Sequence, residues 1–546
     1  MNDLFLLAPI LIVAVTGLVV LVMDLFRSPE ASGGTHLSWI SALGFCAAAA
    51  SSIKLWPGQG GTVDGWMSVL SVNAFTLFFW VLLPLVTALS VLSAAGFDRE
   101  NNLDHGEFYA FHAFALAGMM VMVASVELFT LFLGLETMAL AVYALVAMRR
   151  ASARGSEGAM KYFITGSLAS ALLLYGMVLF WGETGTLVLE DVGRVLAEGK
   201  GGLMLYAAAG LVLVGFGFKV AAVPFHLWTP DAYQGAPTPV TGFMAGAVKA
   251  ASFAALLRVV FVAMLPELFV KSFSFVDVAI AIAVLTMTVG NLMAMHQEDV
   301  KRMLAYSSIS HAGYILAGLA LVPQLGSGDS SLRFVNGAIL FYLAAYGIST
   351  LLAFGVLAHL GHEGSESTTL ERLAGLARRR PGLAALLSLA LLSLAGFPPT
   401  AGFFAKFSLL RELVVVGKGR LIILVVIALV NALFSVYYYL RPMVAMYMRA
   451  PEGEEPQEIR SNTAVVALVA MALAIFGLGI FPDRLTGIAE QAGRAVTYQV
   501  ARGLSEGNVG ALAPFAREQP KSGVGASSGE PAVVSPQDAG GGCQAD

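Results

Sequence analysis

Hydrophobic residues in this chain occur in long continuous runs that short polar segments separate. Each run has about 20 residues, the length that an α-helix needs to cross the hydrocarbon core of a bilayer. Transmembrane β-strands would instead alternate apolar and polar positions over about ten residues. The pattern therefore predicts an all-α, polytopic membrane protein of about 14 transmembrane helices. The runs lie at residues 4–23, 37–55, 70–96, 108–124, 127–148, 160–181, 203–223, 239–264, 274–295, 303–322, 335–360, 383–414, 420–447 and 463–482.

Proline interrupts two of these predicted helices. Pro224 and Pro230 follow helix 7, and Pro398 and Pro399 lie inside helix 12. Proline removes a backbone donor and clashes with the preceding turn, so both helices are expected to break. Irregular backbone at membrane depth persists only where protein or a water-filled cavity satisfies it. Broken helices at matching positions of two halves are typical of the ion path in inverted-repeat transporters.

The two breaks lie five helices apart, and an odd number of helices gives two successive units opposite topologies. We therefore expect two inverted five-helix repeats. The predicted divisions are 1–107 (helices 1–3), 108–265 (repeat 1, helices 4–8), 274–448 (repeat 2, helices 9–13), 463–482 (helix 14) and 483–546 (C-terminal tail). In the tail, a weak surface helix is expected from Arg484 to about residue 515. The rest is rich in Gly, Ser, Pro and Ala and is expected to be disordered.

Basic residues at the helix ends predict the orientation. About 15 Lys and Arg follow odd-numbered helices and about 9 follow even-numbered ones, so the odd loops are expected to be cytoplasmic by the positive-inside rule. Both termini would then face the periplasm of a bacterial cell. Asp3 precedes the first run where a cleaved signal peptide has Lys or Arg, so this run is expected to be a retained helix.

The composition supports the membrane class and narrows the chemistry. Hydrophobic residues make up 57% of the chain and charged residues 12%, against about 25% charged residues in soluble domains. The 2 cysteines are too few for a disulfide framework or an iron–sulfur cluster, and only His112 and His311 of the 8 histidines lie well inside predicted helices. We therefore expect no bound redox cofactor or metal. The net charge of −4 indicates no nucleic-acid partner.

Four charged residues lie inside otherwise apolar runs: Glu136, Lys219, Lys249 and Lys406. A charge at the centre of a membrane helix costs roughly 2.5–3.5 kcal/mol, and four cost on the order of 10 kcal/mol. Ionisable groups at this depth are by default functional and mark proton or ion pathways. Burial disfavours a charged lysine and a nearby carboxylate favours it, so a lysine beside a carboxylate can exchange a proton when the pair opens. The pattern favours a proton relay.

Each of these residues also has a purely structural interpretation. Glu136 can serve only to hold helices together by pairing with a lysine, and Lys249 can form a fixed ion pair. Lys219 would snorkel to the interface if helix 7 ended at residue 223. Lys406 lies only five residues before Arg411, which is compatible with an interfacial position.

Five further polar residues are weaker candidates. His311 can relay protons, since histidine titrates near neutral pH, or it can be a hydrogen-bonded core residue. Lys161, at the start of helix 6, either joins the relay or snorkels. Arg258 lies near the outer end of helix 8 and is expected to snorkel. His226 and Asp231 lie beside the first break and are expected to act as helix caps or loop ties.

Three segments together resemble one membrane-protein family. Residues 223–240 read VPFHLWTPDAYQGAPTPV, residues 305–314 read AYSSISHAGY and residues 396–407 read GFPPTAGFFAKF. They look like the signatures of the antiporter-like membrane subunits of respiratory complex I, the NADH-quinone oxidoreductase. The YQGAP variant resembles the subunit N branch in particular. The resemblance covers about residues 4–482 and leaves the tail outside the shared pattern.

The resemblance implies a role for each intramembrane charge. Glu136 falls at the family's fifth-helix glutamate and Lys219 at the lysine of broken helix 7. Lys249 falls at the eighth-helix lysine, and Lys406 at the twelfth-helix lysine, where a sister subunit has glutamate. The implied function is proton translocation as one subunit of a translocase in the bacterial inner membrane. The lipid bilayer and the other membrane and peripheral subunits of complex I would be its partners, and those subunits would hold NADH, FMN, iron–sulfur clusters and quinone.

The resemblance also suggests a cycle, which is a hypothesis. Quinone reduction elsewhere in the complex would change the pairing of Glu136 with Lys219, which then loses or gains a proton. Lys249 would pass the proton along the membrane, and Lys406 would exchange it with the outer side.

Two alternatives to this function stay open. The nearer is a subunit of a multisubunit cation/proton antiporter or membrane-bound hydrogenase. The more distant is a stand-alone solute transporter, or a structural subunit with locked charge pairs.

Overall fold

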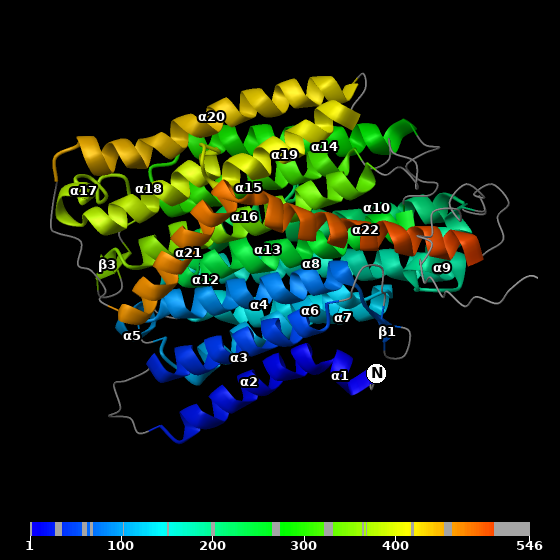
Figure 1. Ribbon diagram of the computed structural model, residues 1–546, viewed down its shortest axis with the longest axis horizontal. Coiled ribbons are helices and arrows are strands. Elements are labelled where there is room, and N and C mark those ends of the chain that lie inside the picture. Colours follow the sequence, from blue (N-terminus) through cyan, green and yellow to red (C-terminus); the bar gives the residue numbers. More distant parts are fainter. Residues whose placement is uncertain are drawn as a thin grey trace, which may run out of the picture. The chain divides into compact units, whose positions relative to one another are not determined.

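The computed structural model is almost entirely helical, as the apolar runs predict. It describes residues 3–27, 35–56, 63–65, 69–101, 103–149, 152–197, 202–264, 273–321, 331–362, 365–366, 368–416, 420–451 and 461–506. The only strands in these ranges form two short antiparallel hairpins, β1 with β2 and β3 with β4. The helices run side by side, with β1 and α9 at one end of the bundle and α5, β3 and α17 at the other (Figure 1). We name these the α9 end and the α17 end.

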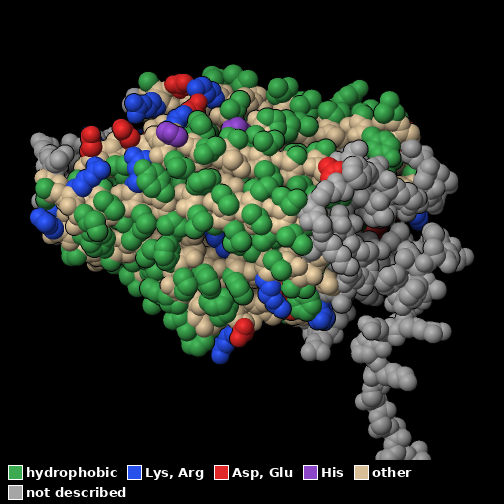
Figure 2. Space-filling view, turned by 90° about the horizontal axis from the view of Figure 1, so that it is seen from above, with side chains coloured by type: hydrophobic (Ala, Val, Ile, Leu, Met, Phe, Trp, Pro, Cys, Tyr) green, Lys and Arg blue, Asp and Glu red, His purple; other side chains and the backbone are tan. Residues whose placement is uncertain are grey.

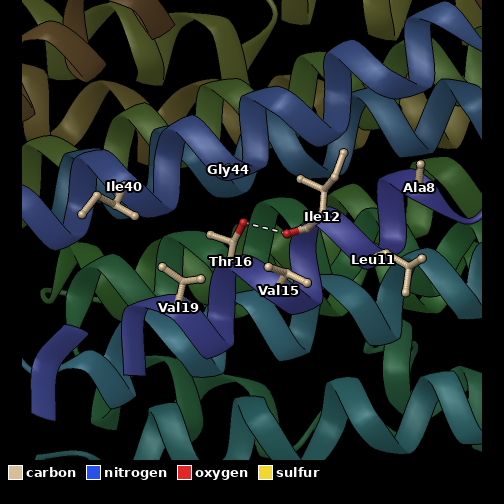
Figure 3. Close-up of a pocket in the computed structure, with 8 residues that line it drawn as sticks. All are labelled: Ala8, Leu11, Ile12, Val15, Thr16, Val19, Ile40 and Gly44. Atoms are coloured by element: carbon tan, nitrogen blue, oxygen red, sulfur yellow. Dashed lines mark hydrogen bonds between the residues drawn. The ribbon is translucent and has the colours of Figure 1, made fainter. Parts of the chain in front are cut away.

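The N-terminal helices pack against the first repeat through α2 and α4, which both contact α6. The elements before the first repeat are α1 Asp3–Leu6, α2 Ala8–Leu25, α3 Thr35–Lys54, β1 Val63–Gly65, β2 Leu70–Val72, α4 Ala74–Ala94 and α5 Phe97–Glu100. An apolar groove of about 490 Å³ lies between α2 and α3 (Figure 3), and its lining contains none of the intramembrane charges. Thr16, the only polar side chain in it, donates its hydroxyl to the Ile12 carbonyl oxygen at 2.7 Å.

The first expected repeat contains a broken helix 7 and a helix 8 with two π-helical turns. Its elements are α6 Gly106–Ala124, α7 Leu128–Ala147, α8 Ala153–Thr184, α9 Leu189–Ala197, α10 Leu203–Val220, α11 Trp228–Gly235, α12 Thr238–Phe243, η1 Met244–Val248, α13 Lys249–Val259 and η2 Val260–Met264. The second expected repeat and the connection within it comprise α14 Phe273–Met295, α15 Val300–Leu319, α16 Leu332–Ala358, β3 Gly361–His362, β4 Ser365–Glu366, α17 Leu376–Arg379, α18 Pro381–Ala395, α19 Ala401–Val416 and α20 Arg420–Met448. Two helices follow, α21 Asn462–Ile480 and α22 Pro482–Glu506.

Every predicted run coincides with a helix or, for helices 7 and 12, with a broken one. In the described ranges, 11 helices are long and apolar enough to cross a membrane. The first halves of the two broken helices, α10 and α18, are apolar but shorter. Hydrophobic side chains cover most of the face in Figure 2, and charged side chains gather toward the α17 end. Helices α12–η2 and α16 are buried along almost their whole length, which places the core where the two repeats meet.

The two repeats begin with the same kind of close helix pair. In the first, Gly118 of α6 faces Gly134 of α7, and a Cβ on either would lie 2.6 Å from a backbone nitrogen of the other helix. In the second, Gly290 of α14 and Gly313 of α15 are equally crowded, because a Cβ would lie 2.6 Å and 2.5 Å from backbone nitrogens opposite. Small residues allow such close approach, which drives association of helices in membranes.

Both predicted breaks are present, and the chain itself satisfies their backbone. Helix α10 ends at Val220 with Ala221 in the left-handed region, and α18 ends at Ala395 with Gly396 in that region. In the first break, the Trp228 indole donates to the Phe218 carbonyl oxygen at 3.1 Å. The Val223 N–H donates to the Thr286 hydroxyl of α14 at 3.0 Å, so the second repeat supports the break in the first.

The helix expected from Arg484 exists as α22, Pro482–Glu506, and one of its faces is exposed as expected. It packs along α16 and α4, with Ala489, Ala492 and Val496 buried. The remainder of the predicted tail, residues 507–546, lies outside the described residues.

Candidate functional site

Glu136 lies in the middle of α7, where its carboxylate is half-buried. It accepts a hydrogen bond from the Ser170 hydroxyl of α8. A hydroxyl donor stabilises the charged form of a carboxylate, which would otherwise be costly at this depth. The Ser170 hydroxyl therefore fixes the Glu136 side chain between two helices of the first repeat.

Lys219 lies in the last turn of α10, two residues before the left-handed Ala221, and its side chain is only 6% exposed. Its Nζ has no hydrogen-bond acceptor among the described residues, and neither has the Tyr143 hydroxyl. Lys219 Nζ lies 5.8 Å from the centre of the Tyr143 ring, and Glu136 acts on both groups electrostatically. Lys219 is therefore buried and does not snorkel. Its interaction with Glu136 is long-range, because Lys219 donates no hydrogen bond to it.

Lys249 begins α13, directly after the π-helical turn η1, and its side chain is 3% exposed. Its Nζ donates to the Ser308 carbonyl oxygen at 2.7 Å and to the Ser308 hydroxyl. Both acceptors are neutral and belong to α15, so the fixed ion pair that the sequence left open is wrong. Lys249 instead joins the first repeat to the second.

His311 follows Ser308 by one turn of α15 and is buried. Its Nδ1 lies 2.7 Å from the Tyr342 hydroxyl of α16, and its Nε2 lies 3.1 Å from the Tyr439 hydroxyl of α20. Lys249 and Lys406 both act on the ring electrostatically. His311 is therefore hydrogen-bonded in the core and also lies between two lysines of the predicted relay, so its two interpretations are compatible.

Lys406 lies in α19, just after the second break, and its side chain is 6% exposed. Its Nζ donates to the Ala395 carbonyl oxygen at 2.9 Å and lies 5.5 Å from the centre of the Tyr314 ring. Ala395 is the last residue of α18, and the C-terminal end of a helix carries partial negative charge that favours a cation. The interfacial position that Arg411 suggested is therefore wrong.

Lys161 lies apart from these groups, in a charged cluster beside the first break. Its Nζ pairs with Asp231 Oδ2 and with Glu157 Oε1, both at 2.7 Å, and the Lys161 side chain is 46% exposed. Arg302 of α15 pairs with Asp231 Oδ1 at 2.9 Å. Burial alone would raise the pKa of Asp231, but hydrogen bonds from Lys161 and Arg302 lower it overall. Asp231 therefore ties both repeats to α11, as expected of a loop tie.

Arg258 does not snorkel, contrary to the prediction. The side chain is 0% exposed and contacts the C-terminal end of α6 and the N-terminal end of α4. Its guanidinium donates to the carbonyl oxygens of Ala124 at 3.3 Å and Ser125 at 3.4 Å, and to the Thr76 hydroxyl at 2.9 Å. Residue counting placed it near a helix end correctly, but it missed that neighbouring segments cover that end.

Several hydroxyl groups of the site have no distinctive sequence signal. Ser170, Ser308, Tyr342 and Tyr439 complete the contacts of Glu136, Lys249 and His311 and come from four different helices. The one signal that could have found any of them is the spacing of Ser308 and His311, which lie three residues apart and share a helix face. In the described residues, no group of three His, Cys, Asp or Glu side chains is placed to hold a metal ion.

The fold and site define a class: a polytopic helical membrane protein with two broken-helix repeats and buried lysines across both. Residues 125–435 match the family described as NADH:quinone oxidoreductase/Mrp antiporter, transmembrane, and the chain belongs to this family.

Similar sequences agree with this membership. NADH-quinone oxidoreductase subunit N 1 of Sorangium cellulosum is 47% identical over 79% of this chain and 85% of its own length. Subunit N of Trichlorobacter lovleyi is 39% identical over 90% of this chain and 97% of its own. A chain of respiratory complex I from Thermus thermophilus is 34% identical, with a TM-score of 0.71, over 88% of this chain and 99% of that one. A chain of the Mrp complex from Dietzia shares the fold at 22% identity, with a TM-score of 0.76, over 90% of this chain and 98% of that one.

Proposed function

We propose that this chain is the proton-translocating membrane subunit of a bacterial NADH-quinone oxidoreductase, in the place of subunit N. One observation carries the proposal: a series of titratable groups extends across both repeats, from the half-buried Glu136 to the buried Lys219, Lys249, His311 and Lys406. Intramembrane groups of this kind mark proton relays. The printed names of the relatives at 47% and 39% identity support the choice of complex.

Lys219 is the group best placed to switch. Within the described part of the chain no hydrogen bond fixes its Nζ, and Glu136 acts on it only at longer range. If Glu136 moves closer, the charged lysine is stabilised; if it moves away, burial favours the neutral amine and the proton leaves. Pair opening and closing thus converts a conformational signal into loss or gain of a proton.

The later groups are suited to conduct the proton. Lys249 contacts Ser308, and His311 follows one turn on, with hydroxyl groups at both ring nitrogens. A neutral imidazole has one donor and one acceptor nitrogen, so it can accept a proton on one side and release one on the other. Lys406, stabilised by the end of α18, is the last buried base of the series and would exchange the proton with the outer side.

The partners and orientation belong to the same proposal. NADH, FMN, iron–sulfur clusters and quinone would reside in other subunits, and this chain would contribute no redox centre. The basic residues at the α17 end would face the cytoplasm by the positive-inside rule, with both termini in the periplasm. The likeness to the Mrp chain, at 22% identity, supports the fold alone and does not favour the antiporter alternative.

The test uses native membrane vesicles that carry Lys219→Ala, with Lys54→Ala as the control. Lys54 is the exposed last residue of α3 and takes no part in the relay. After the assembled complex has been verified, NADH-driven quinone reduction and vesicle acidification are recorded together. We expect both to fall at least roughly tenfold in Lys219→Ala, since loss of a proton-transfer group costs about two or more orders of magnitude in many enzymes. Unchanged NADH oxidation and acidification in the assembled variant would refute the proposal.

A further inference from the structure

Arg258 is a buried charge for which the relay has no use. It lies in the last turn of α13, nine residues beyond Lys249, which is about 14 Å at 1.5 Å per residue. Its side chain is 0% exposed, and the three groups that accept its hydrogen bonds are two carbonyls and a hydroxyl. Because these acceptors are neutral, the hydrogen bonds solvate the positive charge but do not cancel it.

The location of Arg258 is as specific as its contacts. Ala124 and Ser125 are the last residue and the C-cap of α6, and Thr76 lies in the first turn of α4. The guanidinium also lies 5.3 Å from the centre of the Phe75 ring. These elements all end at the α9 end of the bundle, where Glu190 of α9 acts on Arg258 electrostatically. Arg258 thus lies between Lys249 and the α9 end, on the helix that carries Lys249.

Beyond Arg258, the helix that carries both residues is tightly covered by a neighbouring helix. The π-helical turn η2 follows Val259 directly, and α9 packs on it so closely that a Cβ at Gly193 would lie 2.5 Å from the Val262 carbonyl oxygen. A proton leaving Lys249 toward this end would therefore have to pass a fixed cation in a tightly packed region. An arginine in such a position raises an electrostatic barrier against protons and cations, as in water channels.

The second repeat differs on the same side of its lysine. Glu412 lies six residues beyond Lys406 on α19, and its side chain is buried. Its Oε1 lies 3.6 Å from Nη1 of the exposed Arg411, and Glu490 of α22 acts on it electrostatically. A carboxylate attracts a proton where a guanidinium repels it, so the outward direction is favourable at Lys406 and unfavourable at Lys249.

We propose that Arg258 is a selectivity residue that blocks escape of protons from Lys249 toward the α9 end and so forces transfer onward into the second repeat. The proposal rests on the proposed function, because it presumes that Lys249 carries protons. If the proposal is right, loss of Arg258 lets protons leak across the membrane through Lys249. Loss of a residue that only holds helices together would not give a leak that depends on Lys249.

The assay measures passive proton permeability, with no NADH present. Proteoliposomes containing the whole assembled complex are given a pH jump, and a trapped fluorescent pH indicator follows its decay. We expect Arg258→Gln to speed the decay on the order of tenfold, the factor expected when repulsion between unit charges about 10 Å apart is removed at an effective dielectric constant of about 20. Arg258→Lys keeps the positive charge, so the proton permeability of this variant should equal that of wild type. An Arg258→Gln complex that assembles and remains tight would overturn the proposal.

A double variant separates a relay leak from a packing defect. Adding Lys249→Ala to Arg258→Gln should return the permeability toward the wild-type value, since the leak would pass through Lys249. A leak that persists without Lys249 would be a structural defect and would overturn the proposal. The permeability assay needs no NADH. Its result for the Arg258 variants is therefore independent of the Lys219→Ala test of the proposed function.

A second variant decides the case if Arg258→Gln does not assemble. Thr76→Asp leaves Arg258 in place and puts a carboxylate where a hydroxyl accepts its hydrogen bond at 2.9 Å. The new ion pair should neutralise the barrier and raise the permeability by a similar factor. A tight Thr76→Asp complex would contradict an electrostatic role for Arg258.

Discussion

The two broken helices have similar backbones, but their lysines differ in position and in hydrogen bonding. Each first half ends at a residue in the left-handed region, Ala221 with φ 60° and Gly396 with φ 90°. Lys219 precedes its break and has no hydrogen-bond acceptor among the described residues. Lys406 follows its break and donates to the last carbonyl of the preceding helix half. Similar backbones therefore leave a lysine without an acceptor in the first repeat and anchor one in the second.

The difference shows how a break can serve two purposes. A helix C-terminus that points at a lysine holds it through the partial charge on its carbonyl groups. Where the lysine lies inside the terminating helix instead, its Nζ has no acceptor among the described residues, and a carboxylate acts on it only at longer range. In the first repeat, that carboxylate is Glu136 of α7, which accepts a hydrogen bond from the Ser170 hydroxyl of α8. Whether the lysine is anchored thus follows from which side of the break it occupies, and we propose that the unanchored Lys219 is the switch.

The strongest way to test this comparison is to change the left-handed residues themselves. Gly396→Ala forces a Cβ into the left-handed region, which costs roughly 1–2 kcal/mol. The new Cβ would also lie 3.0 Å from Lys406 Cδ and would press on the anchored side chain. We expect a lower temperature of inactivation for the purified complex and weaker proton pumping.

Ala221→Gly is the matched counterpart at the first break. Removing the left-handed strain of Ala221 gains about 1 kcal/mol, and the greater flexibility of glycine together with the loss of a buried methyl offsets it. Stability within about 1 kcal/mol of wild type is therefore expected. If Gly396→Ala were as well tolerated as Ala221→Gly, the anchoring role of the second break would be wrong.

A smaller effect is expected from Asp231, which ties α11 to both repeats. Asp231→Asn removes two partly exposed ion pairs, and we expect a loss of about 1 kcal/mol. Since the pKa of Asp231 is lowered in the folded protein, its stabilising contribution is full above its ordinary pKa near 4 and is lost only as the pH falls through the lowered value. Thermal inactivation of wild type and variant should therefore differ by a constant amount between about pH 6 and 8. A difference that shrinks across this range would contradict the assignment.

Most of the fold and part of the site could be predicted from the sequence. Membrane helices need long apolar runs, so the runs identified the helices, and Pro224 and Pro398 identified the breaks. The charges at Glu136, Lys219 and Lys406 were visible for the same reason, since few ionisable residues are tolerated at that depth.

Tertiary contacts decided what the sequence did not reveal. The hydroxyl groups of Tyr342 and Tyr439 meet at His311 only because α16 and α20 pack on α15, and tyrosines in apolar runs are common. Arg258 looked interfacial because its exposure depends on the elements that cover the α9 end, and these are distant in sequence. Likewise, the polar face of α22 is evident in the sequence, whereas the packing of its other face on α16 is not.

The central claim is that one relay crosses both repeats, and a double-variant cycle tests it most directly. Protons translocated per NADH oxidised are measured for Lys219→Ala, Lys406→Ala and the double variant, each as an assembled complex in proteoliposomes. Residues that act as one unit are strongly non-additive. A single relay predicts that either substitution abolishes the contribution of this subunit and that the double variant loses no more. Additive losses in the double variant would show two independent paths and would contradict the account.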